Sequence, residues 1–329
     1  MGAESDRPLP FAVELALEAA DRLGWPTRVI DPEYGYLWEL ELPDGTRRAL
    51  VGMKTPINDG AASQLSSDKH YSGLVLSEHG IRVPDGERAL SPRHFAGTGY
   101  AERTRLDGVH AFAEARGFPL IVKPNRMSHG RLVRRVSDMR ELEEAVRAVW
   151  ELDRLALIQV VVPGRELRLD LLDGEFLAGY ERRPHRLTGD GQRTMRELLI
   201  ALDSRFASDL ALERAAADGL EATRVLERDE SVELGNGILN LNRSATGVLI
   251  PDLPPRWLAW GRRVADAIGL RLAGIDLRID CEGDPLDADP ERAVVIEVNG
   301  TPLLTQIARL GHRELALDAQ ARILSALAD

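Results

Sequence analysis

The sequence predicts a soluble α/β protein, and three observations favour this fold class. A length of 329 residues indicates two domains, or one domain built from several lobes. The composition, 44% hydrophobic and 29% charged, is typical of a globular chain. Stretches with helical spacing of apolar residues alternate with short apolar runs along the sequence. We therefore expect a mixed α/β fold with α+β character.

The first third of the chain contains two expected helices and four expected strands. The helices are predicted at residues 11–23 and 67–79, and the strands at 27–30, 36–42, 47–51 and 81–84. Pro43-Asp44-Gly45 predicts a hairpin turn between two of these strands. Gly80 is expected to end the second helix, and residues 97–99 form the best candidate linker.

The rest of the chain continues the alternation. Helices are expected at 110–116, 137–151, from about 195, 257–268 and 312–327, and strands at 119–123, 132–136, 156–162, 165–172, 176–182, 272–279 and 293–298. Ser137 is the expected N-cap of one helix, and Thr194 with Glu197 predicts a capping box on the next. Asp173-Gly174 predicts a hairpin turn.

Charge and composition narrow the expected location and partners. The net charge of −11 provides no overall basic field for nucleic acid or an anionic membrane surface. No apolar run is long enough to span a membrane, and the acidic start does not resemble a secretion signal. Cys281 is the only cysteine, which excludes an internal disulfide framework. We expect a cytoplasmic enzyme with no nucleic-acid or membrane partner.

The ends of two predicted strands carry a candidate metal site. Glu297 and Asn299 share one face of their strand because strand side chains alternate, and Asp276 lies in the preceding apolar strand. If the two strands are neighbours, the three side chains converge. Oxygen ligands without cysteine or histidine suit Mg²⁺ or Mn²⁺ better than zinc. The alternative is a solvated acid at each strand end.

Two further segments suggest nucleotide binding. All but three of the 42 basic residues are arginines, and the lysine Lys123 follows an apolar strand and precedes a small polar loop. A compact ammonium group and the backbone N–H groups of such a loop suit polyphosphate. The strand around Gln159 leads into a turn at Glu166, where backbone groups suit an adenine edge and the carboxylate suits ribose hydroxyls. The alternatives are a surface hairpin with an exposed lysine and a core strand with an exposed glutamate.

Together and in this order, these segments resemble the ATP-grasp superfamily from Ser66 onward. The matching motifs are Ser67-Asp68-Lys69, Gly80-Ile81-Arg82-Val83-Pro84, Ile121-Val122-Lys123-Pro124, Pro163-Gly164-Arg165-Glu166, Gly274-Ile275-Asp276 and Glu297-Val298-Asn299-Gly300-Thr301-Pro302. Within the superfamily, the chain most resembles the ligase modules of cyanophycin synthetase and bifunctional glutathione synthetase. The additional matches are Arg182-Arg183-Pro184, residues 188–194, Glu197-Leu198-Leu199 and residues 240–246.

The resemblance implies a fold of two α+β lobes that clamp ATP, preceded by a smaller α/β domain. The expected limits are 1–105 for the N-terminal domain, 106–165 for the lid and 166–329 for the metal- and substrate-binding part. Two Mg²⁺ ions, or Mn²⁺, would be held by Asp276, Glu297 and Asn299. ATP would be bound by Lys69, Lys123, Ser128, His129, Gly130, Gln159, Val160, Val161 and Glu166. The substrate carboxylate or its acyl phosphate would face Arg183, Asn240 and Arg278.

The activity implied by this resemblance is ATP-dependent ligation of a carboxylate to an amine through an acyl phosphate, on amino acids or peptides. The arginines 168, 182, 183, 193 and 243 suit an acidic substrate, although an ordinary solvated face is the alternative. A related enzyme with a thiol or a ribosomal peptide as acceptor, and a nucleotide-binding protein without catalysis, remain open. Ser244-Ala245 replaces the family's paired glycines, and Gln159 replaces a common acid. A homodimer is expected only because dimers are the commonest oligomers.

Overall fold

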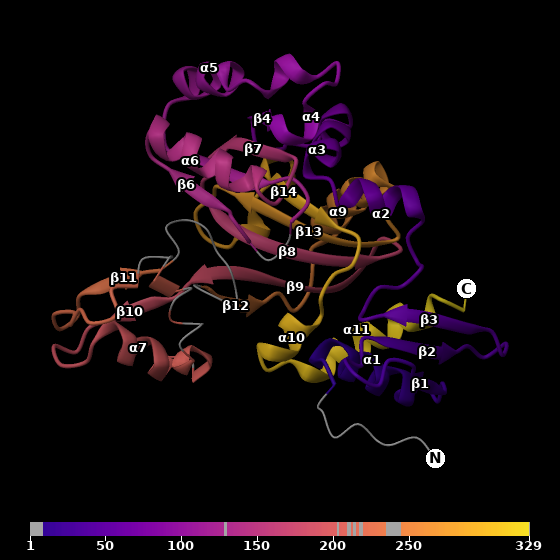
Figure 1. Ribbon diagram of the computed structural model, residues 1–329. Helices are drawn as coiled ribbons and strands as arrows, with labels where there is room; N and C mark the ends of the chain where they lie inside the picture. Colours follow the sequence, from indigo (N-terminus) through magenta and orange to yellow (C-terminus); the bar gives the residue numbers. More distant parts are fainter. Residues whose placement is uncertain are drawn as a thin grey trace. The chain divides into compact units, whose positions relative to one another are not determined.

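The computed structural model describes residues 9–127, 130–202, 204–208, 212, 215–216, 220–234 and 245–328. The chain divides into two compact units, each assembled from separate segments (Figure 1). Unit 1 comprises Met1–Arg82, Leu167–Glu181 and Leu249–Asp329, and unit 2 comprises Val83–Glu166 and Arg182–Val248. The segments of unit 1 are far apart in sequence, so its core depends on long-range packing.

The N-terminal part of unit 1 contains both helices and a small antiparallel sheet. Its elements are α1 (Phe11–Arg22), β1 (Thr27–Val29), β2 (Leu37–Glu41), β3 (Arg47–Val51), α2 (Gly60–Ser66) and α3 (Lys69–Glu78). The predicted β2–β3 hairpin is confirmed, with Gly45 at a φ of 81°. The helix predicted from residue 67 begins instead at Lys69, because the carboxylate of Asp68 caps it by accepting a hydrogen bond from the Tyr71 N–H.

A five-stranded sheet is built from strands that lie between residues 165 and 299. Its strands are, in spatial order, β12 (Ala245–Leu249), β9 (Glu175–Pro184), β8 (Arg165–Leu172), β13 (Leu272–Ile279) and β14 (Val294–Asn299). Asp173 and Gly174 both have positive φ and join β8 to β9, as the turn residues predict. Helix α9 (Pro255–Ile268) packs closely on this sheet, since a side chain at Gly261 would press against Leu171 of β8.

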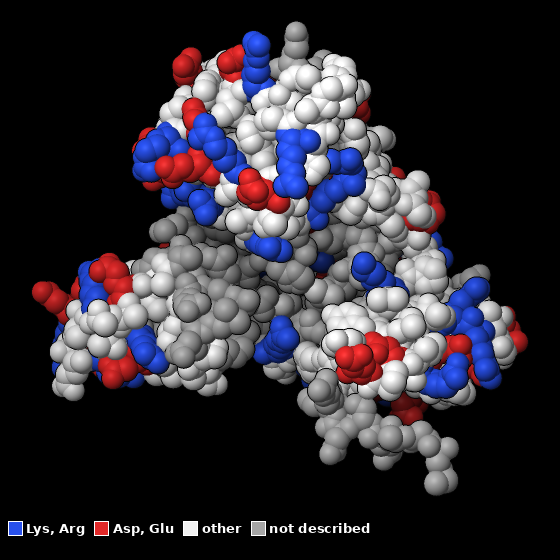
Figure 2. Space-filling model, viewed as in Figure 1, with Lys and Arg blue, Asp and Glu red and all other residues white. Residues whose placement is uncertain are grey.

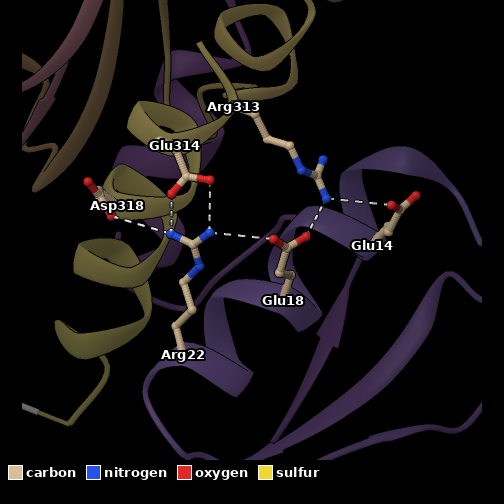
Figure 3. Close-up of polar contacts among 6 residues, drawn as sticks. All are labelled: Glu14, Glu18, Arg22, Arg313, Glu314 and Asp318. Atoms are coloured by element: carbon tan, nitrogen blue, oxygen red, sulfur yellow. Dashed lines mark hydrogen bonds and ion pairs between the residues drawn. The ribbon is translucent and has the colours of Figure 1, made fainter. Parts of the chain in front are cut away.

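The last two helices of unit 1, α10 (Thr305–Arg309) and α11 (Arg313–Ser325), lie beside the first helix. Arg22 of α1 donates two hydrogen bonds to Glu314 of α11, with N–O distances of 2.8 and 3.1 Å (Figure 3). Arg313 reaches back from α11 to Glu14 and Glu18 of α1. We refer to the six residues drawn in Figure 3, namely Glu14, Glu18, Arg22, Arg313, Glu314 and Asp318, as the α1–α11 ion network.

Unit 2 contains a four-stranded sheet with one face covered by helices. The spatial order is β4 (Gly86–Leu90), β7 (Leu155–Val160), β5 (Leu120–Pro124) and β6 (Arg134–Val136). Helices α5 (Asp107–Arg116) and α6 (Met139–Trp150) bury their apolar side chains against this sheet, in one core that includes Leu120, Val122 and Ile158. Two short helical segments, α4 (Pro92–Phe95) and η1 (Ala101–Thr104), precede α5.

Unit 2 has a second, smaller hydrophobic core. Its hydrophobic residues come in part from β10 (Arg186–Thr188), β11 (Ser231–Glu233), α7 (Met195–Leu202) and the 3₁₀ segment η2 (Ser204–Ala207). The predicted capping box is confirmed. The hydroxyl of Thr194 accepts from the Glu197 N–H, and the Glu197 carboxylate accepts from the Thr194 N–H at 2.8 Å. These local hydrogen bonds fix the start of α7.

Two local predictions are wrong. Residues 81–84 form no strand; the strand β4 begins after them, at Gly86, since Pro84 lacks the N–H that a sheet ladder needs. The N-cap of α6 is Asp138 rather than Ser137, because the Asp138 carboxylate accepts from the Glu141 N–H. Ser137 instead donates its N–H to the Glu141 carboxylate. Aspartate and serine are both good caps, so the sequence alone did not separate these neighbours.

Two surface properties complete the description. Basic and acidic side chains are interspersed on the face drawn in Figure 2. Within the part of the chain that the structure describes, no helix combines the length and the apolar character needed to cross a membrane.

Candidate functional site

The predicted metal residues lie on neighbouring strands of unit 1. Strands β13 and β14 pair antiparallel, with Asp276 directly opposite Glu297 and Gly274 opposite Asn299. Opposite residues in an antiparallel pair point to the same face of the sheet. The predicted pairing of these strands is therefore confirmed, and it brings Asp276, Glu297 and Asn299 together.

A β-bulge within this pair keeps the acids on the polar face and the hydrophobic residues in the core. Asp276 pairs with Glu297, but the next residue, Leu277, pairs with Val295. An unbroken strand would place Val295 on the same face as Glu297. The bulge instead directs Val295 into the core beside Leu277, where both are buried.

Asp276 is held by a buried ion cluster. Arg168 of β8 donates a hydrogen bond from Nη1 to Asp276 Oδ2 at 2.8 Å and one from Nε to Asp170 Oδ1 at 2.6 Å. Asn299 donates from Nδ2 to the same Asp276 oxygen at 3.1 Å. The exposed fractions of Arg168, Asp170 and Asp276 are only 7%, 2% and 7%. We refer to Arg168, Asp170 and Asp276 as the buried ion cluster.

Glu297 has a different cationic neighbour. The Lys69 Nζ lies 3.0 Å from Glu297 Oε1, and their side chains are 9% and 24% exposed. Lys69 is the first residue of α3, which packs against β14. A predicted phosphate ligand and a predicted metal ligand therefore form an ion pair, which the sequence did not indicate.

The donor chemistry of this site fits a hard divalent cation. Two carboxylates and one amide converge, and the Asn299 amide donates through nitrogen to Asp276, which leaves its oxygen as the ligand atom for a cation. Across the described residues, no group of three or more histidine, cysteine, aspartate or glutamate side chains is arranged to hold a metal ion. The candidate set contains only two such residues, so its third oxygen would come from the amide.

Lys123 occupies the face of the unit 2 sheet that is opposite its helices. It is 6% exposed, which excludes the alternative of an exposed hairpin lysine. Its register partner on β7 is Leu157, whose partner on β4 is Arg88. Two residues earlier on β5, Ile121 pairs with Gln159 of β7 on one side and with Arg135 of β6 on the other. Arg88 and Arg135 thus share the face of Lys123, and only strand pairing reveals this.

The predicted adenine and ribose residues lie at the end of β7 and the start of β8. Gln159 is on the Lys123 face, and Val160 donates its backbone N–H to the Asp85 carbonyl at 3.0 Å. Val161 follows the end of β7 and is half-buried. Glu166 is buried and accepts a hydrogen bond from Arg182 at 2.5 Å. Any ribose contact at Glu166 would therefore share this carboxylate with Arg182.

The other predicted site residues are more scattered. Gly130 has a φ of 66° in the loop after β5, Arg183 is exposed near the end of β9, and Arg278 is two residues beyond Asp276 on the same face. Ser128, His129 and Asn240 lie outside the described residues.

The predicted arginine-rich substrate side is different in the structure. Arg168, Arg182 and Arg193 form ion pairs with carboxylates of the chain itself. Arg243 lies outside the described residues.

Asn58 links three segments of unit 1, a structural role that the sequence did not indicate. Its Nδ2 donates to the carbonyls of Leu272 and Gly300, each at 2.8 Å. Its Oδ1 accepts from the N–H groups of Arg271 and Leu272, at 2.9 and 3.0 Å. Asn58 therefore ties the start of β13 to the residue after β14. Its place in a polar loop gave no signal, because its partners are more than 200 residues away in sequence.

The architecture is that of an ATP-grasp fold. A bifunctional glutathione synthetase from Pasteurella multocida has a similar structure, with a TM-score of 0.54 and 18% sequence identity over 90% of this chain and 40% of that chain. This similarity confirms the fold class predicted from the motifs. No model of a known protein family matches the sequence.

Two curated relatives extend the similarity to the sequence. Cyanophycin synthetase of Synechocystis is 28% identical over 262 residues, which cover 73% of this chain and 28% of that protein. The glutathione biosynthesis bifunctional protein of Lactiplantibacillus plantarum is 25% identical over 315 residues, which cover 88% of this chain and 39% of that protein. The resemblance to the ATP-grasp superfamily and to these two synthetases is thus confirmed. The chain spans well under half of the length of either relative.

Proposed function

We propose that this chain is an ATP-dependent carboxylate–amine ligase that forms an amide bond on an amino acid or peptide through an acyl phosphate. The main support is the convergence of Asp276, Glu297 and Asn299 on the polar face of β13 and β14, within a sheet whose other face is apolar. A buried strand has no structural need for this set, whereas Mg²⁺-dependent phosphoryl transfer does. The names of the synthetase relatives support the same class of activity.

In this proposal, the lysines neutralise the phosphates of ATP. Lys123 is buried on the face of its sheet opposite the helices, close in register to Gln159, which would bind the adenine edge together with Val160 and Val161. Glu166 would bind the ribose while it remains paired with Arg182. Lys69 would contact a phosphate from the start of α3. Ser128, His129 and Gly130 would complete the phosphate loop.

The chemistry requires activation of a carboxylate, because direct attack by an amine would expel oxide. Phosphorylation gives a better leaving group, and the amine then attacks the acyl carbon. Mg²⁺, when bound by Asp276, Glu297 and Asn299, would neutralise charge on the transferring phosphoryl group. Arg183, Asn240 and Arg278 would orient the carboxylate and stabilise the oxyanion that forms during amine attack. The chain needs no covalent nucleophile for this reaction.

The test is ADP release by the full chain with ATP, Mg²⁺ and pools of amino acids and dipeptides, with and without hydroxylamine. A hydroxamate would identify an activated carboxylate. We expect amine-dependent ADP release in the wild type and none in Glu297→Gln, whereas Glu291→Gln, an exposed control near β14, should behave as the wild type. Turnover only with a thiol or a ribosomal peptide would support a different acceptor, and ATP binding without any turnover would contradict the ligase proposal.

Lys123 provides a separate test of the nucleotide site. Lys123→Ala should weaken ATP binding, measured by calorimetry, much more than it lowers the melting temperature. Arg140→Ala, at an exposed position on α6, is the matched control. Unchanged ATP affinity in Lys123→Ala would contradict the phosphate role.

The proposal also includes a lid over the nucleotide. Residues 106–165 would form the mobile lid, between the N-terminal domain at 1–105 and the metal- and substrate-binding part at 166–329. The second Mg²⁺, the cytoplasmic location and the homodimer stay predictions from the sequence. Limited proteolysis with and without ATP would test the lid, because closure should protect residues within 106–165.

A further inference from the structure

The two acids of the candidate metal site have counter-ions of different kinds. Asp276 and Glu297 lie directly opposite each other, so their like charges repel unless each is neutralised. Arg168 neutralises Asp276, and Lys69 neutralises Glu297. The two cations differ in the geometry of their contacts, because the guanidinium of Arg168 meets two carboxylates and the ammonium of Lys69 meets Glu297.

Arg168 is a fixed counter-ion. Its guanidinium bridges Asp276 and Asp170, at 2.8 and 2.6 Å, and all three side chains are buried on neighbouring strands. The guanidinium lies against Gly274, where a Cβ would overlap it. A planar guanidinium can bridge two carboxylates in a defined geometry, which an ammonium group cannot reproduce. Asp170 therefore fixes Arg168, and Arg168 fixes Asp276.

Lys69 makes a different kind of contact. It has a flexible stem at the start of a helix, and its partner Glu297 has a side chain that is 24% exposed. A lysine ammonium can exchange one anion for another with little rearrangement. The site thus combines one acid that a planar guanidinium contacts, Asp276, and one acid paired with an ammonium group, Glu297.

We propose that Asp170 and Arg168 are positioning residues for the divalent cation, because they lock Asp276 through one oxygen. This inference depends on the proposed function, since it takes Asp276 as a metal ligand. Arg168 and Asn299 both donate to Asp276 Oδ2, and these two hydrogen bonds restrict the orientation of the carboxylate. Residues that orient a metal ligand in this way typically change metal affinity by about 10- to 100-fold when they are replaced.

The variant Asp170→Asn keeps the side-chain volume but removes the charge that holds Arg168. It also removes one of the two carboxylates that neutralise Arg168, so the positive charge of Arg168 repels the cation more strongly. Both effects weaken cation binding. Arg168→Lys keeps the charge and removes the bridge, so it separates orientation from charge. Asp173→Asn is the matched control, because Asp173 lies on the same hairpin and pairs with exposed Arg271 at 2.7 Å.

The measurement is water-proton relaxation enhancement by Mn²⁺ with a non-hydrolysable ATP analogue on the full chain, together with binding of the analogue alone in EDTA. We expect Asp170→Asn and Arg168→Lys to weaken binding of the Mn²⁺–analogue complex by about tenfold or more. Binding of the metal-free analogue should not change, although a general folding defect would weaken both. Asp173→Asn should match the wild type.

The outcomes separate this inference from the proposed function. If the wild type gives relaxation enhancement and both variants match Asp173→Asn, the positioning role is wrong and the metal site stands. If Arg168→Lys retains wild-type affinity, charge alone suffices and the bridging role is wrong. If the wild type itself shows no enhancement, the metal assignment and the proposed function both fail. Should Asp170→Asn not fold, Arg168→Lys carries the test.

Discussion

Two clusters of arginine and carboxylate groups in unit 1 use the same chemistry in opposite surroundings. In the α1–α11 ion network, Arg22 lies among Glu18, Glu314 and Asp318, and the side chains of Arg22 and Glu314 are 36% and 76% exposed (Figure 3). In the buried ion cluster, Arg168 lies between Asp170 and Asp276, and the side chains of Arg168 and Asp170 are 8% and 2% exposed.

The comparison teaches that the number of ion pairs is a poor guide to their importance. When the pairs of the α1–α11 ion network are broken, water solvates the separated charges and replaces most of the lost interaction. The network therefore contributes little to stability. The buried ion cluster has no such alternative, and removal of Arg168 leaves two carboxylates without their counter-ion in a low-dielectric site. The expected effects of substitution therefore differ most between Arg168 and Arg22.

The largest effect should follow Arg168→Met. This variant removes the counter-ion of Asp170 and Asp276 together, so we expect a loss of about 3–5 kcal/mol in the free energy of unfolding. Chemical denaturation at neutral pH measures this loss. The double variant Arg168→Met/Asp170→Leu should recover part of the stability, because it removes one of the uncompensated charges. A loss for Arg168→Met no greater than that for Arg22→Met would contradict the comparison.

An intermediate effect should follow Asn58→Ala, which removes a neutral hydrogen-bonding centre. Four backbone groups lose their partner, at Arg271, Leu272 and Gly300. We expect a loss of about 2 kcal/mol in the free energy of unfolding, since these groups are only partly open to water. Asn58→Asp, measured in the same way, should also destabilise, because a carboxylate cannot donate to the two carbonyls.

A small effect should follow Arg22→Ala. The pairs of Arg22 are exposed, and salt screens them, so the variant should differ little from the wild type at low ionic strength. At about 1 M sodium chloride, where the screening length is about 3 Å, the difference should vanish. Thermal unfolding at the two salt concentrations tests this. A difference that persists in high salt would indicate packing by the arginine stem rather than charge.

The smallest effect should be the pH dependence of that network. The hydrogen bond and the positive charge of Arg22 lower the pKa of the Glu314 carboxyl group. A lowered pKa in the folded state stabilises the protein above the unfolded pKa of about 4.3, and this contribution is lost as the pH falls through the folded value. The stability difference between the wild type and Arg22→Ala should therefore be smaller at pH of about 3 than at pH 7. An equal difference at both pH values would exclude this linkage.

The sequence was most informative where the determining contacts are local. The turns at Gly45 and at Asp173-Gly174 and the capping box of Thr194 and Glu197 follow from neighbouring residues. The convergence of Asp276 with Glu297 and Asn299 followed from alternation along two strands with few candidate partners. The motif order then added the fold class, which the structural similarity confirms.

Contacts between distant segments were beyond the reach of the sequence. Asn58 is bound to backbone groups rather than side chains, so no residue pattern marks it. Arg168 was assigned to a substrate side because its charge suits a carboxylate, but the carboxylates that it meets belong to the protein. Pairing of Lys69 with Glu297 depends on how α3 packs against β14, which residue spacing does not determine.

The bulge in β14 has a consequence for how related sequences are aligned. Pairing passes from Glu297 to Val295 in one step of β13, so β14 contains one residue more than regular alternation requires. Deletion of Ile296 would leave Val295 and Val298 toward the interior and Glu297 and Asn299 toward the opposite side. A gap at this position is thus neutral for the orientation of the strand, whereas a gap between Glu297 and Asn299 would turn one of them inward. Loss of the bulge residue would thus shorten the strand without dismantling its polar end.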